Sequence, residues 1–372
     1  MDGEKLTSKA LQLAWQGAQR PADTVQKHDG CRIAAVGVGD AGCNFISHLA
    51  KNGATHTRTI AIGSNPLRLE TAQADHQILV TRKQHRDRRA NEHPIPDRIA
   101  AEKTRGQIKQ TLAKMDVVII AADLGDEAGT EAAAAVAEAA NTKGALTIGV
   151  VTKPARSKRG TRKVYKAIAK LRRSSDTLIV IDSNRLLETA PQLSADEASK
   201  IVDSAVAQTI RSLAETISAT SHASQDPEDY RTILKQGKVA LVGMGESDAP
   251  NRAEEAVRNA LSSPLMNTDY FSLTGALVHV SGDLKMTTEE TSHVSEIVAK
   301  MMGNDVQVIC GTQVNPKLNG KLRVTLVMTG TDPPPNPRRI STIAPQLFNL
   351  EAKWTPEKRL SVDLDLYQME DY

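Results

Sequence analysis

The chain has 372 residues, which is enough for two domains with separate hydrophobic cores. Hydrophobic residues make up 40% and charged residues 24% of it, as in an ordinary globular protein, and the net charge of +3 does not indicate a nucleic-acid partner. Aromatic residues make up only 3%, which argues against binding single-stranded nucleic acid through stacked bases.

Cysteine spacing and hydropathy indicate the compartment. Cys31, Cys43 and Cys310 are too poorly spaced for a zinc site, so we expect free thiols in a reducing compartment and no metal centre built from them. No signal peptide and no run of about 20 apolar residues are recognisable. We therefore expect a cytoplasmic protein without direct membrane insertion.

The first motif along the chain is Arg32–Asn44, RIAAVGVGDAGCN, which follows a predicted N-terminal helix and linker in residues 1–30. An apolar run, three closely spaced glycines and an amphipathic pattern predict a strand, a glycine loop and a helix N-terminus. Such a turn directs backbone N–H groups and the positive end of the helix dipole at one point, which suits a phosphate. The G-x-G-x-x-G spacing also fits a dinucleotide-binding turn or a tight β–α turn without a ligand.

Short apolar runs alternate with helical patterns from residue 31 to 185, which predicts parallel β/α winding. The basic stretch Arg82–Arg98 fits a solvated loop or an anion-binding loop. The predicted strands are Ile33–Val36, Thr59–Ile62, Ile78–Val80, Val117–Ile120, Leu146–Val151 and Leu178–Ile181, and the predicted helices are Ile99–Leu112, Ala132–Asn141 and Val164–Leu171.

A long helical pattern, Ala195–Ile217, and a polar loop, Ser218–Asp229, separate this region from a second, smaller α/β domain. The tail after residue 331 contains consecutive prolines and ends in Leu360–Tyr372, LSVDLDLYQMEDY, which fits a terminal strand or a disordered recognition peptide. In the second domain we predict strands at Val239–Val242, Leu277–Val280, Val306–Ile309 and Leu322–Met328, and helices at Arg252–Ser262 and Glu289–Met302.

Several segments occur in the order typical of one family: GVGDAGCN, ALTIGVVTKP (145–154), SDTLIVIDSNRLL (175–187), RAEEAVRNALSSPL (252–265) and NGKLRVTLVMTG (319–330). Over residues 31–331 the chain resembles the prokaryotic tubulin homologues, the FtsZ cell-division proteins, of archaeal type. The resemblance implies an α/β fold with a Rossmann-like parallel-sheet GTPase domain, a long central helix and a smaller α/β domain. It also implies head-to-tail assembly into protofilaments.

The resemblance divides residues 31–331 into a GTPase-like domain (31–194), a central helix with the catalytic loop (195–229) and a C-terminal domain (230–331), and the residue pattern adds an N-terminal helix and linker (1–30) and a tail (332–372). It implies GTP as the ligand, with Mg²⁺ as a candidate companion ion. The family's nucleotide-binding positions fall on Gly39, Asp40, Ala41, Gly42, Cys43, Asn44, Gly125, Ala128, Gly129, Thr130, Lys158, Arg162 and Ser204.

Catalysis in the family comes from the loop after the central helix of the next subunit, where two aspartates polarise the water that attacks the γ-phosphate. Asp226 and Asp229 occupy these positions. The chemistry requires carboxylates that orient water beside a triphosphate, which is mainly positioning and electrostatics.

The phosphate signature departs from the family pattern. Where the family has GGGTGTG, this chain has GDEAGTE over residues 125–131. Asp126, Glu127 and Glu131 place negative charge near the expected triphosphate, and one carboxylate about 4 Å from a phosphate costs about 4 kcal/mol at an effective dielectric constant of about 20. The family's ribose-contacting glutamate is replaced by Lys158, and its base-reading aspartate by Ser204, with Asp203 beside it.

Two accounts fit these departures. In the first, the protein is a GTPase with weak or altered activity, in which Arg86, Arg88, Arg89 and Lys158 rebuild the phosphate site. In the second, it is a pseudo-GTPase that does not bind nucleotide and copolymerises with an active homologue. A third hypothesis, a dinucleotide-dependent oxidoreductase, is disfavoured because residues 63–65 lack the expected acidic residue.

The expected partners are other copies of this chain or a homologue in a head-to-tail polymer, and a membrane-anchor protein that reads Leu360–Tyr372. The expected location is the cytoplasm, at the division site. We expect no nucleic-acid partner.

Overall fold

The computed structural model describes residues 31–51, 53, 57–80, 106–125, 127–153, 161–184, 187, 192–218, 227–236, 239–263, 272–302 and 306–331. The predictions for residues 1–30, for Arg82–Arg98 and for the tail beyond 331 lie outside these residues. The chain forms two compact units, one of residues 1–151 and 157–175 and the other of residues 152–156 and 176–372.

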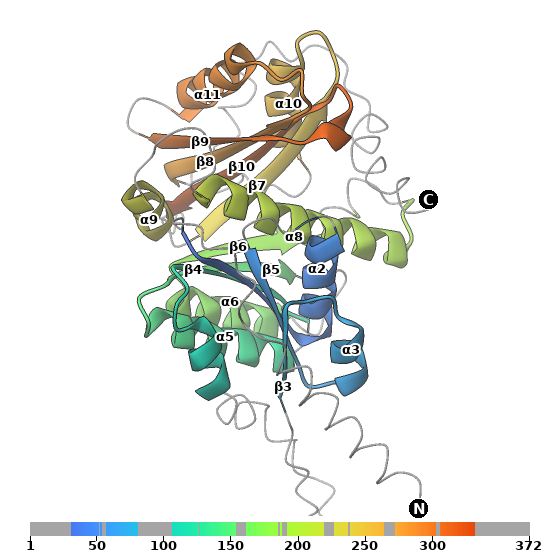
Figure 1. Cartoon of the computed structure of the whole chain (residues 1–372), viewed down its shortest axis with the longest axis vertical. Helices are drawn as coiled ribbons and strands as arrows, with labels where there is room; N and C mark the ends of the chain where they lie inside the picture. Colours follow the sequence, from blue (N-terminus) through green and yellow to red (C-terminus); the bar gives the residue numbers. More distant parts are fainter. Residues whose placement is uncertain are drawn as a thin grey trace, which may run out of the picture. The chain divides into compact units, whose positions relative to one another are not determined.

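The first unit is an α/β structure in which helices flank a sheet (Figure 1). Its strands lie in the order β3-β2-β1-β4-β5. β1 pairs in parallel with β2 and β4, and β2 pairs in parallel with β3, which confirms the predicted parallel winding. The strands are β1 (Ile33–Val38), β2 (Thr57–Gly63), β3 (His76–Leu79), β4 (Val117–Asp123) and β5 (Leu146–Lys153), and the helices are α2 (Gly39–Lys51), α3 (Pro66–Thr71), α5 (Glu127–Asn141) and α6 (Thr161–Ser174).

β1 is the central strand of this unit, and all six of its residues are buried. A continuous apolar run is what a parallel strand covered on both faces requires. The short helix α3 was not predicted; Asn65 caps it by accepting hydrogen bonds from the backbone N–H groups of Leu67 (3.1 Å) and Arg68 (3.4 Å).

The second unit has strands in the order β6-β7-β10-β8-β9. β6 is parallel to β7 and β8 is parallel to β9, whereas β10 is antiparallel to β7 and β8. The strands are β6 (Thr177–Asp182), β7 (Val239–Ser247), β8 (Ser272–Gly282), β9 (Gln307–Val314) and β10 (Leu322–Thr331), and the helices are α8 (Ala195–Ile217), α9 (Pro227–Gln236), α10 (Arg252–Leu261), α11 (Thr288–Met302) and the 3₁₀ helix η2 (Pro316–Leu318).

The long helix α8 has the predicted bounds, and its start is fixed by a capping box. The Ser194 hydroxyl accepts from the Glu197 N–H (3.2 Å), and the Glu197 carboxylate accepts from the Ser194 N–H (2.8 Å). The predicted loop Ser218–Asp229 is too long at its C-terminal end, because α9 already begins at Pro227.

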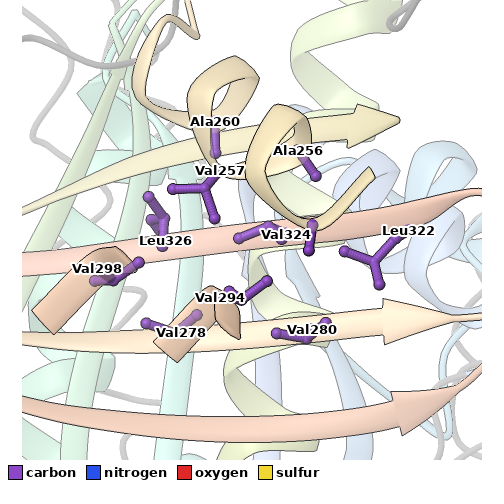
Figure 2. Close-up of a cluster of buried hydrophobic side chains, with 11 residues drawn as sticks. Ala256, Val257, Ala260, Val278, Val280, Val294, Val298, Leu322, Val324 and Leu326 are labelled. Carbon is purple, nitrogen blue, oxygen red and sulfur yellow. The ribbon is translucent and has the colours of Figure 1, made fainter. Parts of the chain in front are cut away.

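The core of the C-terminal sheet contains mainly small and branched aliphatic side chains, as the scarcity of aromatic residues requires. α10 packs its apolar face on β7 and β10, and α11 packs on β8 and β9, around one shared core (Figure 2). A Cβ added to Gly245 would lie 2.2 Å from the Ala256 carbonyl oxygen, so β7 and α10 approach backbone to backbone. The buried members include Val257, Ala260, Val278, Val280, Val294, Val298, Leu322, Val324 and Leu326.

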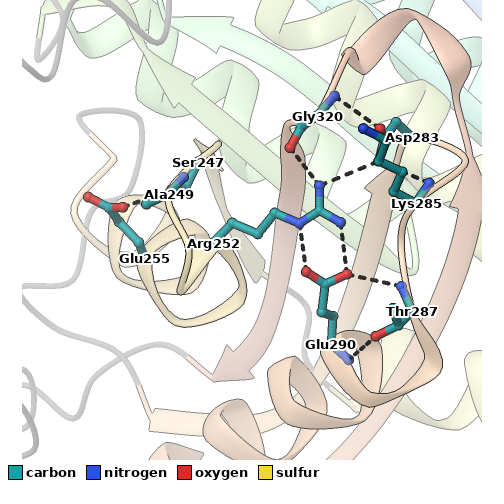
Figure 3. Close-up of polar contacts among 9 residues, drawn as sticks. All are labelled: Ser247, Ala249, Arg252, Glu255, Asp283, Lys285, Thr287, Glu290 and Gly320. Carbon is teal, nitrogen blue, oxygen red and sulfur yellow. Dashed lines mark hydrogen bonds and ion pairs between the residues drawn. The ribbon is translucent and has the colours of Figure 1, made fainter.

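Arg252 connects three separate segments at the edge of this core (Figure 3). Its guanidinium donates to both carboxylate oxygens of Glu290 (2.6 and 2.9 Å) and to the Gly320 carbonyl (2.5 Å). Asp283 lies 3.4 Å from the same guanidinium and accepts the Gly320 N–H (3.1 Å). Glu290 and Thr287 form a reciprocal capping box at the start of α11.

We predict that Glu290→Gln lowers the free energy of unfolding by about 2 kcal/mol at pH 7, because it weakens a bidentate, largely buried pair. Arg252 holds the pKa of the Glu290 carboxyl below its usual value. The stabilisation is therefore present above the unfolded-state pKa of about 4.3 and is lost as the pH falls through the lower folded-state pKa. Urea denaturation of both proteins between pH 7 and pH 3 measures this difference.

Glu254→Gln is the matched control. It removes an acid that contacts Arg258 (3.0 Å) one turn away on α10, where both side chains are about one-third exposed. We expect a loss below about 0.5 kcal/mol, since exposed pairs of this spacing contribute little. Equal losses for the two variants would contradict the role assigned to Arg252.

Candidate functional site

The glycine loop is the junction at which β1 passes directly into α2. Gly39, the first residue of α2, has φ +80°, a conformation that favours glycine. A Cβ added to Gly37 would lie 2.0 Å from the Gly42 carbonyl oxygen, and one added to Gly42 would lie 2.7 Å from the Ala121 carbonyl oxygen. The glycines therefore let β1, α2 and β4 approach backbone to backbone, independently of any ligand.

The first turn of α2 presents the groups that suit an anion. The N–H groups at the start of a helix have no partner within the helix and carry the positive end of its dipole. Ala41 is half-buried there, whereas Asp40 and Asn44 are exposed. Asp40 therefore adds a solvated negative charge beside the N–H groups instead of filling the turn.

Cys43 stands where the resembled family has glycine, but its side chain does not enter the loop. It is 3% exposed and packs with Ala61, Leu69 and Ala72 in a cluster between α2, β2 and α3. Its sulfur lies 4.0 Å from the Ile62 carbonyl oxygen, and burial raises the pKa of the thiol to about 12. This departure changes core packing and leaves only the Cys43 backbone near the loop.

The second loop lies at the same edge of the sheet. β1 and β4 are parallel neighbours with Val38 opposite Ala122, so the loops that follow them begin side by side. α5 begins at Glu127, five residues before the predicted helix. The predicted contact positions Ala128, Gly129 and Thr130 are therefore in the first turns of a helix, where Gly129 and Thr130 are buried, and only Gly125 is in the preceding turn.

Asp123, at the end of β4, is a site residue that the sequence analysis missed. Its half-buried carboxylate accepts a hydrogen bond of 2.6 Å from the Gly125 N–H. That N–H belongs to the predicted phosphate-binding loop, so a carboxylate already occupies it. The available signal was an acidic residue at the carboxyl end of a parallel strand, which is where α/β sheets bind ligands.

Glu131 has a partner that the sequence analysis did not predict. It lies on α5 with a carboxylate oxygen 4.0 Å from the Lys170 ammonium on α6, so its charge is directed at a neighbouring helix. Asp126 lies outside the described residues, as does the side chain of Glu127. Asp123 and Asp40 are thus the acids that the structure brings to the two loops.

The remaining predicted residues are only partly placed. Lys158 and Asp226 lie outside the described residues, and Arg162 is described only by its backbone, in the first turn of α6. In the second unit, Ser204 is half-buried on α8. Asp229, also half-buried, lies in the first turn of α9 and not in a loop, next to the buried Tyr230.

A polar cluster in the second unit was not predicted. The last two residues of β5 belong to the second unit, and there the Lys153 ammonium lies 2.7 Å from one oxygen of Asp182, at the end of β6. Asn184 donates its backbone N–H (3.0 Å) and its side-chain amide (2.9 Å) to the other oxygen. Burial raises the pKa of Asp182, but these hydrogen bonds lower it more, so the carboxyl has a pKa below its usual value.

Comparisons with known proteins agree with this geometry. Residues 32–191 match the Tubulin/FtsZ family, GTPase domain, and residues 238–332 match the FtsZ family, C-terminal domain. The chain is 36% identical over 307 residues to cell division protein FtsZ 2 of Methanocaldococcus jannaschii, covering 82% of this chain and 81% of the relative. It is 37% identical over 303 residues to cell division protein FtsZ 1 of Pyrococcus furiosus, covering 80% and 81%.

Solved structures give the same result. The FtsZ dimer of M. jannaschii matches with a TM-score of 0.73 and 31% identity, over 89% of this chain and 92% of that chain. CetZ2 of Haloferax volcanii shares the fold, with a TM-score of 0.63 and 16% identity over 89% and 98%. The chain belongs to the tubulin/FtsZ family, which confirms the resemblance. None of the helices described is long and apolar enough to span a membrane.

We predict that Gly37→Ala lowers the free energy of unfolding by about 3 kcal/mol, because the added methyl group has no space beside Gly42. Gly106→Ala is the control, since a Cβ there meets no atom within 4 Å. Chemical denaturation measures both variants. Equal midpoints would contradict the close approach of β1 and α2.

Proposed function

We propose that the chain is an FtsZ-like cytoskeletal protein of cell division. Copies assemble head to tail into protofilaments, and GTP binds between subunits and is hydrolysed weakly or in an altered fashion. Family membership supports this proposal, as do the two relatives named as cell division proteins and the related FtsZ that was solved as a dimer.

The first loop fits a nucleotide phosphate. Gly39 has no side chain to obstruct the approach, and the first turn of α2 supplies N–H groups and a helix dipole. Arg162 and Ser204 are the candidates for contacts to ribose and base. Serine cannot accept both hydrogen bonds that a carboxylate accepts from guanine, so we expect reduced guanine selectivity. Mg²⁺, when bound with GTP, would neutralise part of the phosphate charge.

The second loop supports the proposal that GTP binding is altered. The Asp123 carboxylate, 2.6 Å from the Gly125 nitrogen, holds the N–H that a phosphate oxygen would need. A carboxylate about 4 Å from a phosphate costs about 4 kcal/mol at an effective dielectric constant of about 20, which corresponds to about a thousandfold in affinity. Basic residues among Arg82–Arg98 and Lys158 are the candidates that offset this repulsion.

Asp226 and Asp229 are the proposed catalytic residues, and they act on the nucleotide of the neighbouring subunit. Asp229 is in the first turn of α9, and the buried Tyr230 next to it anchors that turn in the second unit. A carboxylate on a helix with a buried neighbour is well positioned to orient a water molecule.

The alternative function is a pseudo-GTPase that does not bind nucleotide and supplies Asp226 and Asp229 to an active homologue in a mixed filament. Two observations favour the pseudo-GTPase. The Gly125 N–H, which a phosphate oxygen would need, already donates to the Asp123 carboxylate. The helix α9, which carries Asp229, is nevertheless formed. In either function, we propose that Leu360–Tyr372 binds a membrane-anchor protein at the division site in the cytoplasm.

We predict that GTP binds the native protein saturably but weakly, and that Asp123→Asn binds at least tenfold more tightly because one negative charge is removed. Titration of fluorescently labelled GTP and GDP measures both affinities. Glu70→Gln is the charge-matched control, since Glu70 is an exposed acid on α3. Absence of binding up to millimolar GTP in all three proteins would leave only the pseudo-GTPase.

We predict that Asp229→Asn abolishes GTP turnover and leaves GTP affinity within about twofold, because the carboxylate acts on the neighbour's nucleotide. Phosphate release and nucleotide titration measure the two effects. Asp248→Asn, an exposed acid of the same unit, is the control and keeps its turnover. Unchanged turnover in Asp229→Asn would remove this residue from the active site.

A further inference from the structure

β9 is an open edge strand of the second unit. Its eight residues pair with β8 along their full length, from Gln307 opposite Gly275 to Val314 opposite Gly282, without a register shift. Among the described residues, no strand pairs with its other side. β9 contains no charged residue and no proline, although edge strands are usually protected by charge, proline, a bulge or short length.

The apolar margin beside β9 is incompletely covered. Val308 and Cys310 on β9 pack against the core with only partial burial. Three neighbours on α11, Ile297, Met301 and Met302, are also only partly buried. An added strand with apolar side chains toward α11 would extend this core.

The end of β9 combines exposed apolar and basic side chains. Leu284 is 80% exposed and Val314 is 45% exposed. They lie at the same end of the sheet, because the Gly282 carbonyl accepts the Asn315 N–H at 2.7 Å. Lys285 and Lys317 are exposed at this end as well, and so is Glu289, whereas Asp283 and Glu290 are paired with Arg252. It therefore suits a segment that is apolar and acidic.

We propose that the C-terminal segment Leu360–Tyr372 of the same chain adds to this edge as a strand parallel to β9 when no anchor protein is bound to the segment. In LSVDLDLYQMEDY, Leu360, Val362, Leu364 and Leu366 alternate with polar residues, so period 2 directs all four toward one face. In the parallel direction, the acidic end of the segment, with Glu370 and Asp371, reaches Lys285 and Lys317.

The connecting chain is long enough. β10 ends at Thr331, opposite Ser272 at the start of β8, and β9 is the next strand. A strand beyond β9 is three strand spacings from β10, about 15 Å, whereas the length of residues 332–359 allows a reach of at most about 90 Å. Such a tether gives an effective concentration of about a millimolar, so even weak strand pairing is populated. This inference does not depend on nucleotide binding.

Hydrogen–deuterium exchange of the full chain tests the proposal on the β9 amides that face away from β8. We expect these amides to exchange at least tenfold faster in Leu364→Pro, because proline cannot continue the strand. Lys353→Pro, a matched proline outside the proposed strand, leaves their exchange unchanged. Protection should be independent of protein concentration.

Two results would overturn the inference. One is equal exchange of β9 in the native protein and in Leu364→Pro. The other is protection that rises with protein concentration and persists in Leu364→Pro, which would assign this edge to a second copy of the chain.

Discussion

The close approach of β1, α2 and β4 is the constraint on which the first unit depends. A Cβ on Gly37 would lie 2.0 Å from the Gly42 carbonyl oxygen, and one on Gly42 would lie 2.7 Å from that of Ala121. This contact directs the start of α2 to the edge where β4 also ends. The same packing thus forms the fold and presents helix N–H groups to an anion. Because packing alone requires these glycines, they identify the family and do not guarantee the ligand.

Acidic side chains lie at this edge of the sheet. Asp123 occupies the Gly125 N–H, and Asp40 is exposed beside the first turn of α2. Glu131, by contrast, is directed at Lys170 on α6. Cys43 is buried among apolar residues of α2, β2 and α3. These side chains therefore differ in effect: Asp40 and Asp123 lie at the two loops, whereas Cys43 and Glu131 affect core packing and a helix contact instead.

Much of the fold could be predicted, because continuous apolar runs and a 3.6-residue period are local signals. Every predicted strand in the described residues is present, and α8 has its predicted bounds. α3 was missed because six residues are too few for a period, although Asn65-Pro66 is a helix-start signal. The start of α5, the direction of Glu131 and the burial of Cys43 depend on helix faces and tertiary contacts, which one sequence does not show. Asp123 was missed because an acidic residue after a strand is a weaker signal than the glycine pattern that follows it, and its hydrogen bond to the Gly125 N–H depends on the conformation of the turn.

The central claim is that a tubulin-like phosphate site is retained but weakened by its own carboxylates. The most direct measurement is the amount of guanine nucleotide released by denaturing the purified protein, compared with its binding of added GTP. The account predicts far less than one nucleotide per chain after purification, and saturable binding when millimolar GTP and Mg²⁺ are added. One tightly held nucleotide per chain would contradict it.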